Sequence, residues 1–266
     1  MNFLSMLWCE ILICFSRRRW VAAPLFAFVL AALVLADIGT RRWGLQPANQ
    51  WDILLGVFNN KFIVVVLLPV VFLALVTDSI TFDTEGRAHL TLVRLPSRAV
   101  WWWSKVGLMG AASFVYVSVM FLCVGFTSTP AVPLQWSWSR LVLLSGWAYP
   151  GGLPISHLHT PPPVIILKIF GLIWLGLFAL GTAVATLGFI TRYAIIGWIA
   201  GAVAVLVSYG TWSVWGPTLH LFLSAHREFN GGVPGSPTLW WSVLLDGAML
   251  TASVLVGYLF TLRRDF

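Results

Sequence analysis

Residues 164–190 read VIILKIFGLIWLGLFALGTAVATLGFI, and Lys168 is the one charged residue among them. At a rise of about 1.5 Å per residue, a helix over this stretch is about 40 Å long, which exceeds the ~30 Å hydrocarbon core of a bilayer. Backbone groups in lipid must be hydrogen-bonded internally, and a run this long and uniformly apolar is typical of a helix rather than a barrel strand. The stretch therefore predicts a membrane-spanning helix.

The composition of the whole chain agrees with this prediction. Of the 266 residues, 59% are apolar and 9% are charged, whereas soluble domains contain about 45–50% and about 25%. The excess of 16 basic over 9 acidic residues indicates loop charges that set orientation rather than nucleic-acid binding. The three cysteines lie scattered in apolar segments and show neither a disulfide framework nor a zinc spacing.

Apolar runs of similar character recur along the chain. They predict a single all-α integral membrane domain over residues 1–266, with six transmembrane helices at 20–36, 57–77, 106–126, 164–190, 194–215 and 239–262. The apolar segment 3–15 is too short to span, and Arg17, Arg18 and Arg19 follow it, so residues 1–19 are expected to form an interfacial helix. Pro69, in mid-span, is expected to kink the second helix.

The distribution of basic residues predicts the orientation. With the N-terminus in the cytoplasm, ten of the 16 lysines and arginines fall on the inner side and six on the outer side, so both termini are expected to be cytoplasmic. Two long loops then lie outside. The proline- and tryptophan-rich loop 127–163 is expected to form a compact cap, and 216–238 is expected to dip back as a short re-entrant segment.

The segment 83–95, between the second and third spans, has the pattern of a short cytoplasmic helix. Asp83 or Thr84 provides an N-cap and Pro96 ends the helix. A basic stripe and an apolar stripe run along it: Arg87, Thr91 and Arg94 on one side, and Ala88, Leu92 and Leu95 on the other. Such a helix either rests on anionic headgroups or docks a cytoplasmic protein, and the pattern does not decide between the two.

The sequence contains none of the common catalytic motifs that we sought. There is no G-x-x-x-x-G-K-[ST] loop for ATP, no G-x-S-x-G elbow and no H-E-x-x-H pair, so no catalytic residue is predicted. Four histidines fall on the outer side: His157, His159, His220 and His226. No carboxylate or cysteine stands near His157 and His159 at a ligand spacing, and no metal site is predicted.

Asp246 is the one acidic residue well inside a predicted span, about 10 Å from its outer end. An intramembrane carboxylate is a candidate functional residue by default. A structural pair with Lys168, which lies at a comparable depth, and simple protonation are the alternatives. Pairs of small residues at Gly107 and Ala111 and at Gly197 and Gly201 indicate close helix packing, either within the chain or at a dimer seam.

Four local features together resemble one family. Glu10 precedes the arginines 17–19; Pro96, Ser97, Arg98, Trp101 and Lys105 match a P-S-R-x-x-W-x-x-x-K stretch; a proline-bounded outer segment lies before the last span; and the chain ends Arg263, Arg264, Asp265, Phe266, similar to an R-R-D terminus. In this order the features resemble the permease subunit of type-2 ATP-binding-cassette (ABC) exporters. The loop 127–163 is longer than the corresponding connection in that family.

The resemblance implies a division of labour between subunits. The segment 83–95 would be the coupling helix on a separate ABC ATPase subunit, which would bind ATP and Mg²⁺, and this chain would hold no cofactor. The implied coupling interface consists of Asp83, Glu85, Arg87, Ala88, Thr91, Leu92, Arg94 and Leu95, with Glu10 alongside. A second permease copy or a paralogue, and the lipid bilayer, would be the other partners, with no nucleic acid.

The implied activity is export of a hydrophobic or amphipathic substrate, such as a drug, a lipid-linked molecule or a peptide, across the plasma or inner membrane. Two other functions stay open. A gradient-driven transporter or channel would use Asp246 as its ion or proton site and would work without an ATPase. A membrane-embedded metalloenzyme would use the outer histidines.

Overall fold

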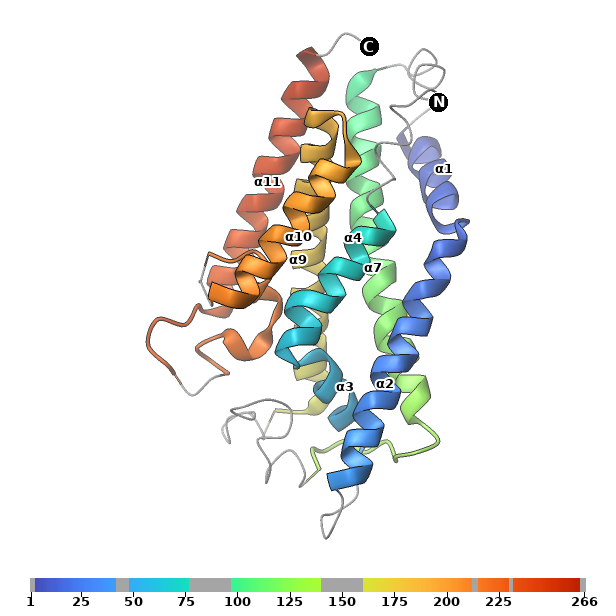
Figure 1. The fold of residues 1–266 in the computed structure, drawn as a ribbon, viewed down its shortest axis with the longest axis vertical. Coiled ribbons are helices and arrows are strands. Elements are labelled where there is room, and N and C mark those ends of the chain that lie inside the picture. The colour runs from blue at the N-terminus through green and yellow to red at the C-terminus, as the bar shows by residue number, and fades with distance from the viewer. Residues whose placement is uncertain are drawn as a thin grey trace.

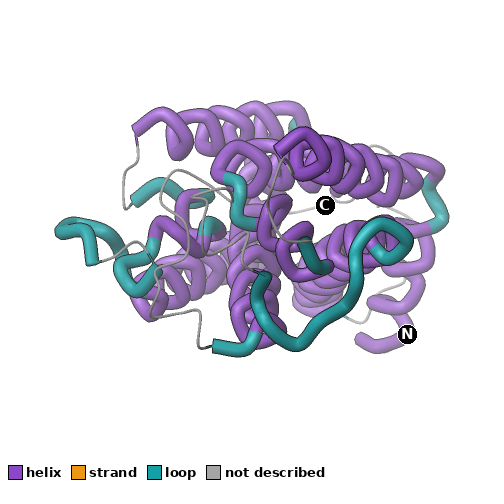
Figure 2. The backbone as a smooth tube through the Cα atoms, turned by 90° about the horizontal axis from the view of Figure 1, so that it is seen from below, coloured by secondary structure: helices purple, strands orange, loops and turns teal. Residues whose placement is uncertain are grey.

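The structure is a computed structural model that describes residues 3–41, 48–76, 97–139, 160–211, 215–229 and 232–263. Within these ranges every regular element is a helix, and Figure 2 shows only helices and loops there. Five of the described helices are long and apolar enough to cross a membrane, or six if one bent pair counts as a single span. The chain is therefore a helical, multi-pass membrane protein.

The helices follow most of the predicted spans. Their bounds are α1 Phe3–Phe15, a 3₁₀ turn Arg18–Val21, α2 Ala22–Arg41, α3 Gln50–Phe58, a π-helical turn Ile63–Leu67, α4 Leu68–Val76, α7 Arg98–Ser128, α9 Pro162–Thr191, α10 Ala194–Thr211 and α11 Leu239–Arg263. The predicted spans 106–126, 164–190 and 239–262 lie inside α7, α9 and α11. Of the predicted span 194–215, α10 covers 194–211, residues 212–214 lie outside the described residues, and Trp215 is in a turn. The segment 83–95 lies outside the described residues.

The predicted span 57–77 is wrong at its start and in its continuity. Asn49 and Asp52 form a capping box that begins α3 at Gln50: the Asn49 side chain accepts a hydrogen bond from the Asp52 amide, and the Asp52 carboxylate accepts one from the Asn49 amide. Helix α3 ends at Phe58, and the helical segment 63–76 that follows is inclined to it by 61°. Asn60 Oδ1 accepts from the amides of Phe62 and Ile63 at 3.0 and 3.2 Å, which starts the second segment. The span is a broken helix.

The sharp bend is at Asn59 and Asn60, not at Pro69 as expected. Proline has no amide hydrogen, so Pro69 cannot bond to the carbonyl of Val65. The residues just before it form the π-helical turn Ile63–Leu67, in which the Leu68 amide donates to the Ile63 carbonyl. A π-turn is a common local irregularity in helices. Here it widens the helix in the turn before Pro69.

Helices α7 and α9 form the centre of the bundle (Figure 1). Helix α9 contacts α7, α10 and α11, while α7 also contacts α1 and α2. The start of α1, the start of α7 and the end of α11 lie at the same end of the molecule, which is the upper end in Figure 1. This end is called the α7-start end below, and the other is called the α7-finish end.

The small-residue pairs pack within the chain. A Cβ atom at Gly197 of α10 would lie 2.5 Å from the backbone oxygen of Val184 in α9, and one at Gly201 would lie 2.6 Å from the Val184 side chain. At Gly107 of α7 the nearest atom is a Leu7 methyl carbon of α1, at 3.1 Å. These glycines thus allow α9 to approach α10, and α1 to approach α7, within one chain.

The part of the 127–163 loop that is described, 127–139 and 160–163, is held against the start of α3. The Asn49 side-chain amide donates to the Ser137 carbonyl at 2.7 Å, and the Trp51 indole donates to the Gln135 carbonyl. Trp138 donates to the Thr160 carbonyl at 3.0 Å. The Trp136 side chain is 80% exposed. Residues 140–159 lie outside the described residues, so the compact cap stays a prediction.

Candidate functional site

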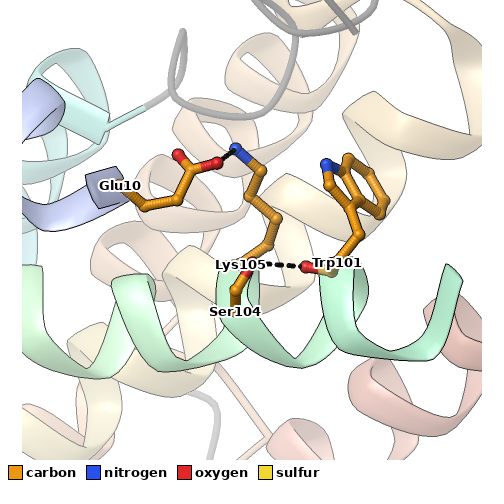
Figure 3. Close-up of polar contacts among 4 residues, drawn as sticks. All are labelled: Glu10, Trp101, Ser104 and Lys105. Atoms are coloured by element: carbon orange, nitrogen blue, oxygen red, sulfur yellow. Dashed lines mark hydrogen bonds and ion pairs between the residues drawn. The ribbon is translucent and has the colours of Figure 1, made fainter. Parts of the chain in front are cut away.

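A buried ion pair joins α1 to α7 at the α7-start end. The Lys105 ammonium lies 2.7 Å from Glu10 Oε1, and its side chain is fully buried while that of Glu10 is 14% exposed (Figure 3). The same ammonium lies 5.8 Å from the centre of the Trp101 ring, which is within reach of a cation–π interaction. Because a buried lysine without a counter-ion is costly, this pair fixes where α1 sits on α7.

The local sequence explains why these side chains meet. Ser97 accepts a hydrogen bond from the Val100 amide and caps α7. Trp101 and Lys105 then stand one turn apart on the same helix face. In Figure 3 the Trp101 ring and the Lys105 chain rise from α7 on the side where Glu10 approaches, whereas Ser104 donates back to the Trp101 carbonyl at 2.7 Å.

Trp101 and Trp102 are core residues rather than interface anchors. Each is 1% exposed, and both rings pack against Phe189 of α9. The Trp102 indole donates to the Val254 carbonyl of α11 at 3.0 Å. The start of α7 is thereby fixed to α1, α9 and α11 together.

Helix α1 turns its charge inward and an apolar stripe outward. Leu4, Trp8 and Leu12, spaced by four residues, are 52–70% exposed, whereas Met6 and Cys14 are buried and Glu10 is held by Lys105. A helix that faced water would present the opposite pattern. The outward stripe is suited to contact with lipid. The interfacial position of residues 1–19 stays a prediction.

A second buried polar group lies where 215–229 meets α11. This segment forms two 3₁₀ turns, Leu219–Leu221 and Leu223–Ala225. The re-entrant position expected for 216–238 stays a prediction. Ser242 Oγ of α11 lies 2.7 Å from His220 Nδ1 and 2.7 Å from His226 Nε2, and all three side chains are fully buried. One hydroxyl thus bridges two histidines, and we call this contact the Ser242 bridge.

Asp246 lies one turn beyond Ser242 on α11 and is 1% exposed. Neither carboxyl oxygen has a hydrogen-bond partner among the described residues. The pair with Lys168, one of the alternatives that the sequence left open, is not formed: the Lys168 ammonium lies 5.5 Å from the centre of the Phe229 ring. A Cβ atom at Gly176 of α9 would lie 3.4 Å from Asp246 Oδ2 and 2.6 Å from a Leu221 methyl carbon, so α9 closes this region from the opposite side.

Two further contacts hold the segment 215–229 to the bundle. Ser224 Oγ donates to Asn59 Oδ1 at 2.8 Å, at the break between α3 and the π-turn. The Thr218 amide contacts Ser208 Oγ of α10 at 3.5 Å. The segment is therefore attached to three separate parts of the bundle, through Ser242, Asn59 and Ser208.

His226 lies outside the spanning helices, and burial lowers its pKa below the ordinary value of 6.5, although its hydrogen bond to Leu223 and the charge of Glu228 act in the opposite direction. Burial favours neutral imidazole. His226 thus stays uncharged at neutral pH.

The predicted residues are only partly brought together. Glu10 meets Lys105, and Asp246 lies beside the Ser242 bridge, but the other predicted interface residues, all in 83–95, and His157 and His159 lie outside the described residues. Among the described residues no group of three or more His, Cys, Asp or Glu side chains is placed to hold a metal ion. The sequence analysis did not identify Ser242 or Asn59 as site residues. For Ser242, the one available signal was its i, i+4 spacing from Asp246.

No protein-family model matches the chain, and neither the curated proteins nor the solved structures contain a match to it.

Proposed function

We propose that this chain is the permease subunit of a type-2 ABC exporter that works with a separate ATPase subunit. The proposal includes six membrane crossings, cytoplasmic termini at the α7-start end, and 83–95 as the coupling helix. Two permease chains would form the pathway for a hydrophobic or amphipathic substrate.

One observation carries the proposal. The residues that give the sequence its resemblance, Ser97, Trp101 and Lys105, belong to one structural unit with Glu10. Ser97 starts α7, Trp101 packs into the core and Lys105 binds α1. This supports a common role for them: they make the end of α7 that follows 83–95 into a rigid joint.

Such a joint suits mechanical coupling. The segment 83–95 lies directly before Ser97 in sequence, so a displacement there would pass into α7 and, through the Glu10–Lys105 ion pair, into α1. The contacts of Trp101 and Trp102 with α9 and α11 would pass it to the rest of the bundle. ATP would favour the closed ATPase pair and thereby shift the population of permease conformations.

The test is purification of the tagged full chain from its native membrane in mild detergent, followed by measurement of ATP hydrolysis. We expect a P-loop ATPase to co-purify in fixed stoichiometry and to be stimulated by the permease. Glu85→Ala and Arg94→Ala should reduce that stimulation without changing the thermal unfolding of the chain. Arg192→Ala, which removes a positive charge from the turn between α9 and α10, is the control and should retain it. Unchanged stimulation in both 83–95 variants contradicts the coupling-helix assignment.

A gradient-driven transporter is the second candidate, because Asp246 is buried and its oxygens lack hydrogen-bond partners among the described residues. It predicts solute uptake into vesicles that contain the purified chain alone and an imposed proton gradient. Uptake that disappears in Asp246→Asn favours this candidate, whereas dependence on ATP and on a co-purified ATPase favours the exporter.

A further inference from the structure

The hydrogen positions in the Ser242 bridge follow from its acceptors. His226 Nδ1 lies 2.9 Å from the Leu223 carbonyl oxygen, which only accepts, so this nitrogen carries the hydrogen. In a neutral imidazole His226 Nε2 is then an acceptor, and it takes the single hydrogen of the Ser242 hydroxyl. Ser242 Oγ in turn accepts from His220 Nδ1. The three hydrogen bonds all run in one direction, from His220 through Ser242 and His226 to the Leu223 carbonyl, and they require a neutral His226.

In its neutral form His220 then carries its hydrogen on Nδ1, and its Nε2 is a basic nitrogen. A proton added at this nitrogen leaves all three hydrogen bonds intact: His220 to Ser242, Ser242 to His226, and His226 to the Leu223 carbonyl. A proton added at His226 Nε2 instead reverses the bond to Ser242, because Nε2 then donates to the hydroxyl oxygen, and the hydroxyl hydrogen loses its acceptor. The bridge is therefore stable while His226 is neutral, which is the form that burial favours in the structure.

Asp246 is the acidic group next to the Ser242 bridge. It follows Ser242 by four residues on one face of α11, and it is closed off by Gly176 of α9 and by Leu221, the neighbour of His220. An ionised carboxylate that is buried without hydrogen-bond donors is strongly destabilising. A proton on the carboxyl group removes this cost, so the buried arrangement requires one.

Three charged side chains in or near the segment 215–229 make contacts elsewhere, and that of Arg227 is exposed. The Glu228 carboxylate accepts from the Leu239 amide at 3.2 and 3.3 Å, at the start of α11. Lys168 of α9 lies over the Phe229 ring. At the α3 break, Lys61 donates to the Tyr209 carbonyl at 3.1 Å. These contacts supply no counter-ion to Asp246.

We propose that Asp246 is a proton-binding site that the segment 215–229 closes: the proton stays on the carboxyl group while the segment is seated through the Ser242 bridge, and it exchanges with water when the segment lifts. Seating of the segment is thus linked to pH. Rising pH removes the proton and favours lifting, while strong acid charges His226 and thereby weakens the bridge, because the charge is buried. The proposal does not depend on an ATPase partner and stands apart from the proposed export function.

The test is infrared difference spectroscopy of the full chain in lipid nanodiscs, titrated from about pH 4 to about pH 9, the range that brackets ordinary and strongly shifted carboxyl groups. We expect a carbonyl band of a protonated carboxyl group at neutral pH that Asp246→Asn removes. Ser242→Ala should weaken proton binding at least about tenfold, so that the band disappears at least about one pH unit lower, because the unseated segment admits water.

Thr261→Val is the matched control. Thr261 is a buried hydroxyl on the same helix, but it donates to the Gly257 carbonyl of its own helix at 2.7 Å, so its removal should leave the titration unchanged. Amide hydrogen exchange of residues 219–226, corrected for intrinsic rates, should rise with pH in the wild type and stay flat in Asp246→Asn. A band that persists in Asp246→Asn, or a titration in Ser242→Ala that matches the wild type, overturns the proposal.

Discussion

At the scale of single residues, the buried charges are the features with the clearest consequences. Lys105 and Asp246 are both almost fully buried, but they differ in their hydrogen-bond and ion-pair partners. Lys105 has a carboxylate at 2.7 Å, whereas Asp246 has no hydrogen-bond partner among the described residues. A charge that is paired this closely stabilises a defined geometry, and a lone acidic group is stable in such a place only in its neutral form.

The ion pair between Glu10 and Lys105 gives a first prediction. Glu10→Gln leaves the Lys105 ammonium buried without a counter-ion and should lower the free energy of unfolding by about 3–5 kcal/mol. The double variant Glu10→Gln with Lys105→Met removes both charges and should recover most of that loss. Thermal unfolding of both variants in one detergent measures the difference. If the double variant is as unstable as the single one, the pair does not hold α1 in place.

Arg192 gives a second prediction at the same scale. It lies between α9 and α10 with a φ of 67°, in the left-handed region that favours glycine. Arg192→Gly should raise the free energy of unfolding by about 0.5–1 kcal/mol, because glycine adopts this conformation without strain. Arg192→Ala keeps a Cβ atom and should give no such gain. Equal stability of the two variants in thermal unfolding would exclude backbone strain at this turn.

At the scale of elements, the close approach of α9 and α10 depends on Gly197. A methyl group there would lie 2.5 Å from a backbone oxygen of α9, which cannot rotate away. Gly197→Ala should therefore cost about 1–3 kcal/mol through overpacking. Gly210→Ala in the same helix meets nothing within 4 Å and should be neutral or slightly stabilising. Similar unfolding temperatures for the two variants would show that α9 and α10 separate without loss.

Sequence patterns predict these elements to different degrees. Uniform apolar runs give α9 and α11 almost completely and the middle of α7, since length and hydropathy decide membrane insertion. The first eight residues of α7, from Arg98, were not predicted. The start of α3 was missed because Asp52 is charged, although Asn49 and Asp52 have the spacing of a capping box. The break at Asn59 and Asn60 is also visible as adjacent polar residues, but the contact of Asn59 is with Ser224, which is 165 residues away.

The candidate sites were harder to predict than the helices, for a related reason. Asp246 was identified because a carboxylate inside an apolar run is conspicuous by itself. Its lack of a pair with Lys168 depends on side-chain direction, and the Ser242 bridge depends on the path of a connection that has no periodic pattern. Glu10 was identified, but its contact with Lys105 joins two helices that are far apart in sequence. Single-residue chemistry is predictable from sequence, while long-range pairing is not.

At the scale of the whole molecule, the two polar sites lie in different parts of the bundle. The Glu10–Lys105 ion pair stiffens the α7-start end, where α1, α7, α9 and α11 are tied together. The Ser242 bridge holds the connection between α10 and α11 at the start of α11, whereas the ion pair lies at the end of the molecule where α11 finishes. Both sites contact helices that also contact α9 or α7. A displacement at one site therefore has a continuous helical path to the other.

The predicted orientation of this bundle can be tested directly. In a chain with Cys9, Cys14 and Cys123 replaced by alanine, Tyr193→Cys and Val233→Cys place single thiols at side chains that are 63% and 52% exposed. The basic residues at the α7-start end favour the cytoplasmic side for that end, so a membrane-impermeant thiol reagent added to intact cells should label Cys at 233 and not at 193. Inside-out vesicles should give the reverse. Labelling of 193 in intact cells would place the α9–α10 turn outside, where 83–95 has no access to a cytoplasmic ATPase, and the proposed export function would then fail together with the orientation.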